Sequence, residues 1–200
     1  MSPMSDPTTP ATDSPATRGA APAAAGPVIR PMTLADCDRV AEIRVAGWRT
    51  AYRGLMPQPY LDGLSVARDA ERRREVFTRD RTDVVNLVAE HGGEVAGWAA
   101  HGPYRDDESG LTADAELYTL YVDPARQGRG IGHALLQEVL RQRAGLGHDL
   151  IMLWVVKGNT PARRFYERAG FAADGAEEPF EAGGASVPEV RYVRHLGPGA

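Results

Sequence analysis

The chain has 200 residues, a net charge of −4 at pH 7 and 42% hydrophobic residues, which fits a single globular domain. Its acidic balance, with a pI near 5.7, argues against a nucleic-acid partner. It has no apolar run of the roughly 18 residues that a transmembrane helix needs, so no membrane partner is expected. The single cysteine, Cys37, excludes an internal disulfide, and the five histidines lack metal-ligand spacing. We therefore expect a cytoplasmic protein without a bound metal.

Residues 1–27 consist mainly of Pro, Ala, Ser and Thr and contain almost no large apolar group. Such a segment cannot bury enough surface to offset its ordering entropy, so it is expected to be a disordered tail. The structured domain is predicted to span 28–196, followed by a loose tail at 197–200. It begins with a strand over 28–32, where Pro31 favours the edge of a sheet.

A helix is predicted to follow the capping box of Thr33 and Asp36. Its apolar residues recur at steps of three and four, so they are expected to form one buried stripe: Leu34, Cys37, Ala41, Val45 and Trp48. The aromatic stretch 48–61 is interrupted by glycine and prolines and favours a loop or loose helix. Ser65 begins a charged helix that extends to about residue 79, with Arg72, Arg73 and Arg74 as its solvated face.

The next segments indicate a β-hairpin, with strands over 84–90 and 94–101 around a Gly-Gly turn. Two further strands are predicted near the C-terminus, over 171–178 and 187–196. Strands outnumber helices around what should be one mixed, mostly antiparallel sheet with flanking helices, so the fold class is α+β.

The most informative stretch lies between these strands, from Glu116 to Phe171. It begins with a strand that has large side chains on both faces, which Asp123-Pro124 ends because proline has no N–H for a ladder. Glycines at 128, 130 and 132 then lead into a helix. The first N–H groups of a helix have no intrahelical partner, and glycine lets a ligand come close to the backbone. This pattern predicts a phosphate site, with Arg126 and Arg129 adding positive charge.

The segment Gln127-Gly-Arg-Gly-Ile-Gly132 is neither a dinucleotide fingerprint nor a P-loop, because its glycine spacing differs and no Lys-Ser/Thr follows. It resembles the Q/R-x-x-G-x-G/A signature of the GCN5-related N-acetyltransferase (GNAT) family. The second half of the stretch is similar to the same family: a strand, Asn159, then a helix with Tyr166. In that helix Thr160 can provide the cap and Gly170 can end it.

The resemblance implies acetyl-CoA as co-substrate. Its pyrophosphate would bind the glycine amides, and its pantetheine would pair with the strand at Leu120 and Val122. Two parted central strands would admit the thioester, and an amide near Leu120 or Tyr121 would stabilise the oxyanion. The expected cofactor-binding residues are Leu120, Tyr121, Val122, Gln127, Gly128, Arg129, Gly130, Ile131, Gly132 and Asn159.

Direct attack of an amine on a thioester needs a proton acceptor, since an alkylammonium with a pKa of about 10.4 is mostly protonated at neutral pH. Glu116 is the candidate base, and a surface carboxylate without a catalytic role is the alternative. The leaving thiolate needs an acid, for which Tyr166 is suited, with a core tyrosine as the alternative. Asn159 could bind the cofactor or simply cap its helix.

The predicted function is an acetyl-CoA-dependent N-acetyltransferase that acts on a primary amine of a small molecule or peptide. A non-catalytic acyl-CoA-binding module of the same fold is the alternative, and a homodimer through the last strands stays open. The aromatic residues Trp48, Tyr52 and Tyr60 could either wall the acceptor pocket or pack in the core. A group of acidic residues would attract a cationic acceptor if it faces the cleft: Asp106, Asp107, Glu108, Asp114 and Glu116.

Overall fold

A computed structural model describes residues 26–79, 83–105, 111 and 113–197. The predicted tail at 1–27 therefore lies outside the described residues apart from its last two positions, and so do Asp106, Asp107 and Glu108. The described strands are β1 (Val28–Pro31), β2 (Val85–His91), β3 (Glu94–Pro103), β4 (Ala115–Val122), β5 (Leu150–Val156), β6 (Ala172–Ala182) and β7 (Ala185–His195). The α-helices are α1 (Cys37–Ala51), α2 (Gln58–Asp62), α3 (Val66–Thr78), α4 (Ile131–Gly145) and α5 (Thr160–Arg168). The short 3₁₀ helices are η1 (Leu34–Asp36) and η2 (Pro124–Arg126).

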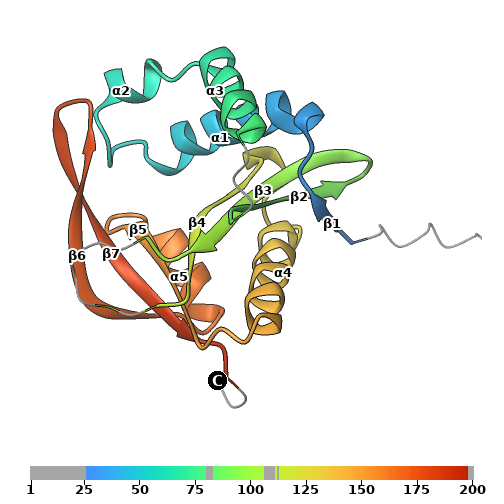
Figure 1. Cartoon of the computed structure of the whole chain (residues 1–200). Coiled ribbons are helices and arrows are strands. Elements are labelled where there is room, and N and C mark those ends of the chain that lie inside the picture. The colour runs from blue at the N-terminus through green and yellow to red at the C-terminus, as the bar shows by residue number, and fades with distance from the viewer. Residues whose placement is uncertain (1–25, 80–82, 106–110, 112, 198–200) are drawn as a thin grey trace, which may run out of the picture.

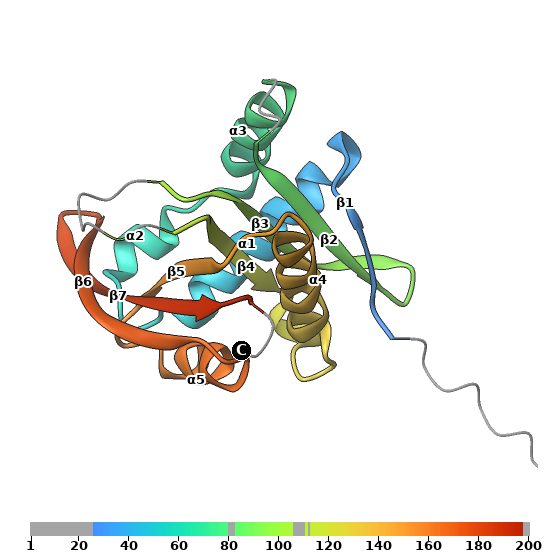
Figure 2. The same cartoon turned by 60° about the horizontal axis from the view of Figure 1, so that its bottom comes forward.

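The seven strands form one sheet in the order β1-β2-β3-β4-β5-β7-β6. Every neighbouring pair is antiparallel except β4 and β5, which run parallel. Helices α1 and α3 cover one face, and α4 and α5 cover the other (Figure 1). A second view places α1 on the far side of the strands from α4 (Figure 2). The predicted α+β class and the mostly antiparallel sheet are confirmed.

Three apolar clusters fill the layers between these elements. The largest joins the inner face of α4, including Leu135 and Leu136, to Ile151 and Leu153 of β5. A second packs α1 on β2 and β3. A third joins the end of α1 to the tips of β5 and of the β6–β7 hairpin, through residues such as Trp48. This third cluster connects the N-terminal helices to the C-terminal strands beyond the sheet itself.

Most of the features predicted for the N-terminal helix are present in the structure. The capping box is present, with the Thr33 N–H donating to Asp36 Oδ2 at 2.7 Å. The predicted stripe is buried from Cys37 to Trp48, but Leu34 is 47% exposed, so its prediction is wrong. The reason is that Leu34 lies in η1, whose tighter turn rotates it away from the face that α1 buries.

Two other side chains differ from expectation. The Arg73 side chain of α3 is only 14% exposed: it forms an ion pair with Asp69 and its guanidinium lies 3.9 Å from the centroid of the Trp98 ring, so it does not belong to a solvated face. The α5 helix is capped by Asn159 rather than Thr160, because the Asn159 Oδ1 accepts the Ala162 N–H at 3.2 Å.

Candidate active site

The loop from β4 into α4 is fixed by contacts on both sides. Asp123 caps η2 by accepting the Ala125 N–H at 3.0 Å, and it pairs with Arg39 of α1. Arg126 donates to the carbonyl oxygen of His91 at 2.6 Å and pairs with Glu94. This arginine was predicted to add charge to a phosphate site, but it is engaged by the β2–β3 hairpin. The loop beyond it is therefore preorganised before any ligand binds.

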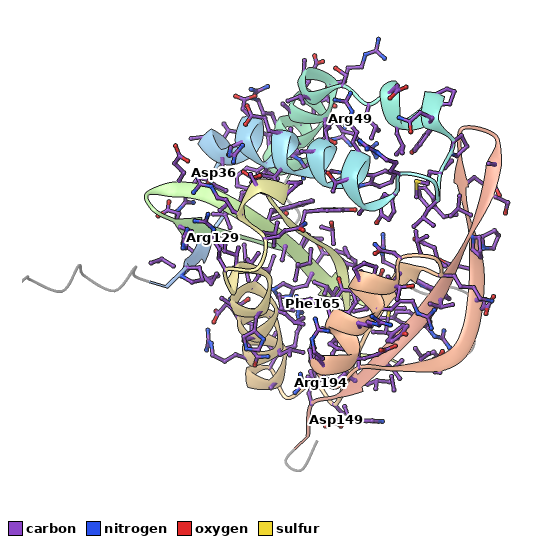
Figure 3. All side chains as sticks on the ribbon, turned by 180° about the vertical axis from the view of Figure 1, so that it is seen from behind. Asp36, Arg49, Arg129, Asp149, Phe165 and Arg194 are labelled. Atoms are coloured by element: carbon purple, nitrogen blue, oxygen red, sulfur yellow. The ribbon has the colours of Figure 1, made fainter. Side chains whose placement is uncertain are left out.

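Beyond these anchors the backbone is open. Residues 127–130 are exposed, and among the described residues no acceptor receives the N–H groups of 127–133. Gly128 and Gly130 have φ of 76° and 77°, and a Cβ added to either would meet nothing within 4 Å. Free amides at the positive end of a 15-residue helix are suited to an anion, so the phosphate site that the sequence predicts here stays a prediction with compatible geometry. Arg129 lies at this end of α4 (Figure 3).

Gly132 and Ile131 have a different part in this turn. A Cβ on Gly132 would lie 3.4 Å from Val122 and 3.6 Å from the ring of Phe165, so the residue is small because α4 packs closely here. Figure 3 places Phe165 between α4 and α5. The Ile131 side chain is 1% exposed and packs in the core. Both residues can therefore offer a ligand only their backbone amides.

Strands β4 and β5 separate beside this loop. Their pairing covers Ala115 with Ile151 and Glu116 with Met152, and it ends there. Among the described residues, the segment 120–122 at the end of β4 thus has no backbone partner on its β5 side, which agrees with the expected parting of the central strands. An extended ligand could pair with this edge by strand addition.

A β-bulge in β4 precedes the unpaired edge. Leu117 pairs with His101 and Thr119 with Ala100, which leaves Tyr118 as an extra residue. The bulge reverses the alternation of side chains, so Leu120 shares the α4 face with Leu117 although they are three residues apart. Tyr121 consequently faces α1, where it stacks on Trp98 with ring centroids 6.3 Å apart.

Glu116 lies where the two strands begin to separate, but it is 2% exposed and held by Arg105. The Arg105 Nε and backbone N–H donate to its Oε2 at 3.0 and 3.2 Å. The interpretation of Glu116 as a surface carboxylate is therefore wrong. To act as a base it would have to give up these donors.

Tyr166 is the buried residue of α5, with its ring 5.1 Å from Phe165 and 5.8 Å from Phe171. Burial, with a smaller contribution from Tyr121, holds the pKa of its phenol well above the ordinary value of 10. The hydroxyl is therefore protonated at any physiological pH and can only donate or share its proton. Tyr121 reaches it from the opposite face of the sheet, across the parted strands.

The Tyr121 hydroxyl is at the centre of a polar group. The hydroxyl of Tyr52, at the end of α1, faces it, and burial raises the pKa of both phenols. Trp48 Nε1 and Thr119 Oγ1 are buried near the same hydroxyl, yet neither has a well-formed hydrogen bond within the described residues. Buried donors left unsatisfied in this way mark a place where water or a ligand completes the bonding.

The family model "Acetyltransferase (GNAT) family" matches residues 44–171, which is more than half of the chain. The chain belongs to the GNAT acetyltransferase family. The N-acetyltransferase YuaI of Bacillus subtilis, itself uncharacterised, is 30% identical over 81% of this chain and 89% of its own length. A mycothiol acetyltransferase of Acidothermus cellulolyticus is 31% identical over 80% of this chain, but the match spans only 52% of that protein.

Solved structures share the GNAT fold. The PaiA N-acetyltransferase of Thermoplasma acidophilum, crystallised with coenzyme A, has a TM-score of 0.66 and 19% identity over 86% of this chain and 99% of its own. YncA of Salmonella typhimurium, crystallised with acetyl-CoA, has a TM-score of 0.64 and 23% identity over 88% and 97%. At these identities the likeness establishes the fold, and it agrees with the topology described above.

In this GNAT domain the predicted residues fall into two groups. The loop 127–132 follows directly after the edge 120–122, and Tyr166 is electrostatically coupled to Tyr121 of that edge, while Asn159 lies at the start of the helix that carries Tyr166. Glu116 lies apart, at the closed end of the parted strands. Among the acidic residues, Asp114 accepts the N–H groups of Asp149 and Leu150 at 2.7 and 3.0 Å, so it is used to fix the start of β5.

Two further residues lie near the site. Tyr52, for which the sequence leaves both core packing and the acceptor pocket open, places its hydroxyl in the polar group at Tyr121. Glu189 of β7 carries no sequence signal, because it is a single glutamate in an alternating strand. Its burial and its β6 neighbour Glu178 raise its pKa to about 7, and such poised carboxyls are found at functional sites. Among the described residues we found no cluster of three or more metal-ligating side chains, and no helix suited to cross a membrane.

Proposed function

We propose that this GNAT protein transfers an acetyl group directly from acetyl-CoA to a primary amine of a small molecule or peptide. One observation carries the proposal: free amides at the start of α4 lie beside the unpaired edge of β4. A diphosphate would bind the amides of Gly128, Gly130 and Gly132, with Gln127 and Arg129 assisting. The pantetheine amides would pair with the backbone of 120–122, which would bring the thioester to the bulge.

Tyr166 is proposed to protonate the leaving thiolate, since its neutral phenol lies on the far side of the parted strands from Tyr121. A thiol has a pKa near 8.5, so a nearby acid helps it to leave. The carboxamide of Asn159 would bind the cofactor through its nitrogen, because its oxygen already caps α5. The relatives named mycothiol acetyltransferase favour a small-molecule acceptor, and the cytoplasm is the compartment we expect.

The test begins with calorimetric titration of acetyl-CoA, for which we expect one site per chain. Release of CoA is then followed with a thiol reagent in the presence of spermidine, kanamycin and an alanine-terminated peptide. Turnover with at least one amine supports the transferase. Binding without turnover of any amine would favour the non-catalytic module instead, and an absence of acetyl-CoA binding would refute both readings.

A further inference from the structure

Glu189 occupies the middle of β7, in register with Val156 of β5 and Glu178 of β6. Strand alternation puts it on the same face as Val187, which packs with Trp48 in the cluster at the end of α1. The residue is half-buried there, within electrostatic reach of Tyr52 at the end of α1. Figure 1 shows the β6–β7 hairpin extending to α2 and to the segment that joins it to α1.

The surroundings of Glu189 leave its charge without compensation. Tyr52 faces it from the end of α1 and Glu178 from β6, while Arg191, two residues along β7, is bound to Asp174. Among the described residues no cation forms an ion pair with it. Burial and the charge of Glu178 therefore raise its pKa to about 7, so the ionised and protonated forms are both present at neutral pH.

Electrostatic coupling links Glu189 to the proposed acid through two tyrosines. Glu189 and Tyr166 both raise the pKa of Tyr52, the Tyr52 hydroxyl faces that of Tyr121, and Tyr121 raises the pKa of Tyr166. Tyr121 belongs to the segment of β4 that lies beyond its pairing with β5.

A second observation marks this place as a binding site. The Trp48 side chain is 7% exposed, and its Nε1–H lies near the Tyr121 hydroxyl without a well-formed hydrogen bond. A buried indole donor left in this state costs free energy unless a bound group accepts from it. The site therefore offers an unused donor, two phenols and a carboxyl without a counter-ion, which is the set of groups that an incoming ammonium and an acyl oxygen require.

We propose that Glu189 binds the ammonium of the acceptor and takes its proton, so that the acceptor is an amine that arrives as a cation from the α1–α2 side. This assignment rests on the proposed acetyl transfer. It departs from the sequence prediction of Glu116, because Arg105 already occupies that carboxylate whereas Glu189 faces no cation.

The proton and bond changes balance as follows. The ammonium passes one proton to the Glu189 carboxylate, and the free amine attacks the thioester carbonyl carbon. The C–N bond forms, the C–S bond breaks, and the thiolate takes the phenolic proton of Tyr166. The second proton of the new amide nitrogen returns to the Tyr166 oxygen, and Glu189 releases its proton to water.

The experiment compares Glu189→Gln with Glu177→Gln as a matched control. Glu177 is on the neighbouring strand, but it is exposed and bound to Lys157. For the fastest amine of the panel, wild-type kcat/KM should rise with pH through about 7, because the base must be ionised. In Glu189→Gln, kcat/KM should no longer rise with pH through 7, and at pH 7 it should be about 100-fold lower than in wild type. The affinity of this variant for acetyl-CoA should be unchanged. The control should behave as wild type, and Glu189→Asp should restore the pH dependence.

A stability measurement separates loss of the base from misfolding. The pKa of Glu189 is raised in the folded state, so its own contribution to stability should fall as pH rises from about 4.5 to 7, and wild type should lose stability relative to Glu189→Gln over that range. Glu189→Gln should therefore melt at the same or a higher temperature than wild type at pH 8. Wild-type rates and pH dependence in this variant would overturn the inference and leave acetyl transfer standing. A wild-type protein that binds acetyl-CoA but acetylates no amine would overturn both.

Discussion

Gly130 and Gly147 lie at opposite ends of α4 and make a matched pair for testing the phosphate site. Their φ angles are 77° and 76°, and a Cβ added to either would meet nothing within 4 Å. Alanine in this left-handed region costs about 1–2 kcal/mol, partly offset by the lower entropy of the unfolded chain. We therefore expect Gly130→Ala and Gly147→Ala each to lower the free energy of unfolding by about 1 kcal/mol.

The two variants should differ in their affinity for acetyl-CoA. A methyl group at Gly130 occupies open space next to the free amides, and relief of its strain would turn those amides away from the ligand. We expect the Kd for acetyl-CoA to be at least tenfold higher in Gly130→Ala, equivalent to about 1.4 kcal/mol of binding free energy, and unchanged in Gly147→Ala. Urea unfolding and calorimetric titration measure the two quantities. Equal losses of affinity, or unchanged binding by Gly130→Ala, would refute the idea that a diphosphate rests on the start of α4.

Three further predictions test other groups. Tyr166→Phe should keep acetyl-CoA affinity but lower kcat about 100-fold, measured by thiol release, and an unchanged kcat would exclude Tyr166 as the acid. Asp36→Asn, which weakens the ion pair with Arg30, should lower the free energy of unfolding at pH 7 by on the order of 2 kcal/mol, as measured by urea denaturation. Because that pair holds the Asp36 pKa below its usual value, the difference should shrink as pH falls below about 4, and a constant difference would contradict this. His101 accepts from Arg143 at 2.6 Å, and burial lowers its pKa to about 4. The contribution of His101 to the free energy of unfolding should therefore fall by about 2 kcal/mol between pH 7 and pH 5, so the stability difference between wild type and His101→Gln should change by that amount.

The sequence predicts most of the elements because their signals are local. The hairpin of β2 and β3, the capping box at Asp36 and the end of α5 at Gly170 each depend on a few adjacent residues. Similarly, the free amides of the loop 127–132 follow from glycine at the start of a helix. These features can be predicted without knowing which distant residues pack against them in the folded chain.

What the sequence misses depends on distant partners. Arg73 looks solvated until Trp98 from another element lies under it, and Glu116 looks like a free base until Arg105 binds it. Glu189 gains its raised pKa from burial in the folded chain and from Glu178 on β6. The bulge at Tyr118, which turns Tyr121 toward α1, appears only in the register of β3 and β4.

The short pairing between β4 and β5 affects how firmly the two halves of the sheet are joined. Within the described residues, backbone hydrogen bonding joins the two halves of the sheet over two residue pairs and the bond from the Asp114 N–H to the Leu150 carbonyl oxygen, so it cannot by itself fix how far apart the open ends stand. A second tie lies beyond the sheet, where Leu55 and Tyr60 press on glycines 158 and 183 so closely that an added Cβ would approach them to 2.6 and 2.9 Å. These two close contacts therefore brace the C-terminal half of the sheet against the N-terminal helices, and we expect a smaller side chain at either position to let the open ends move further apart.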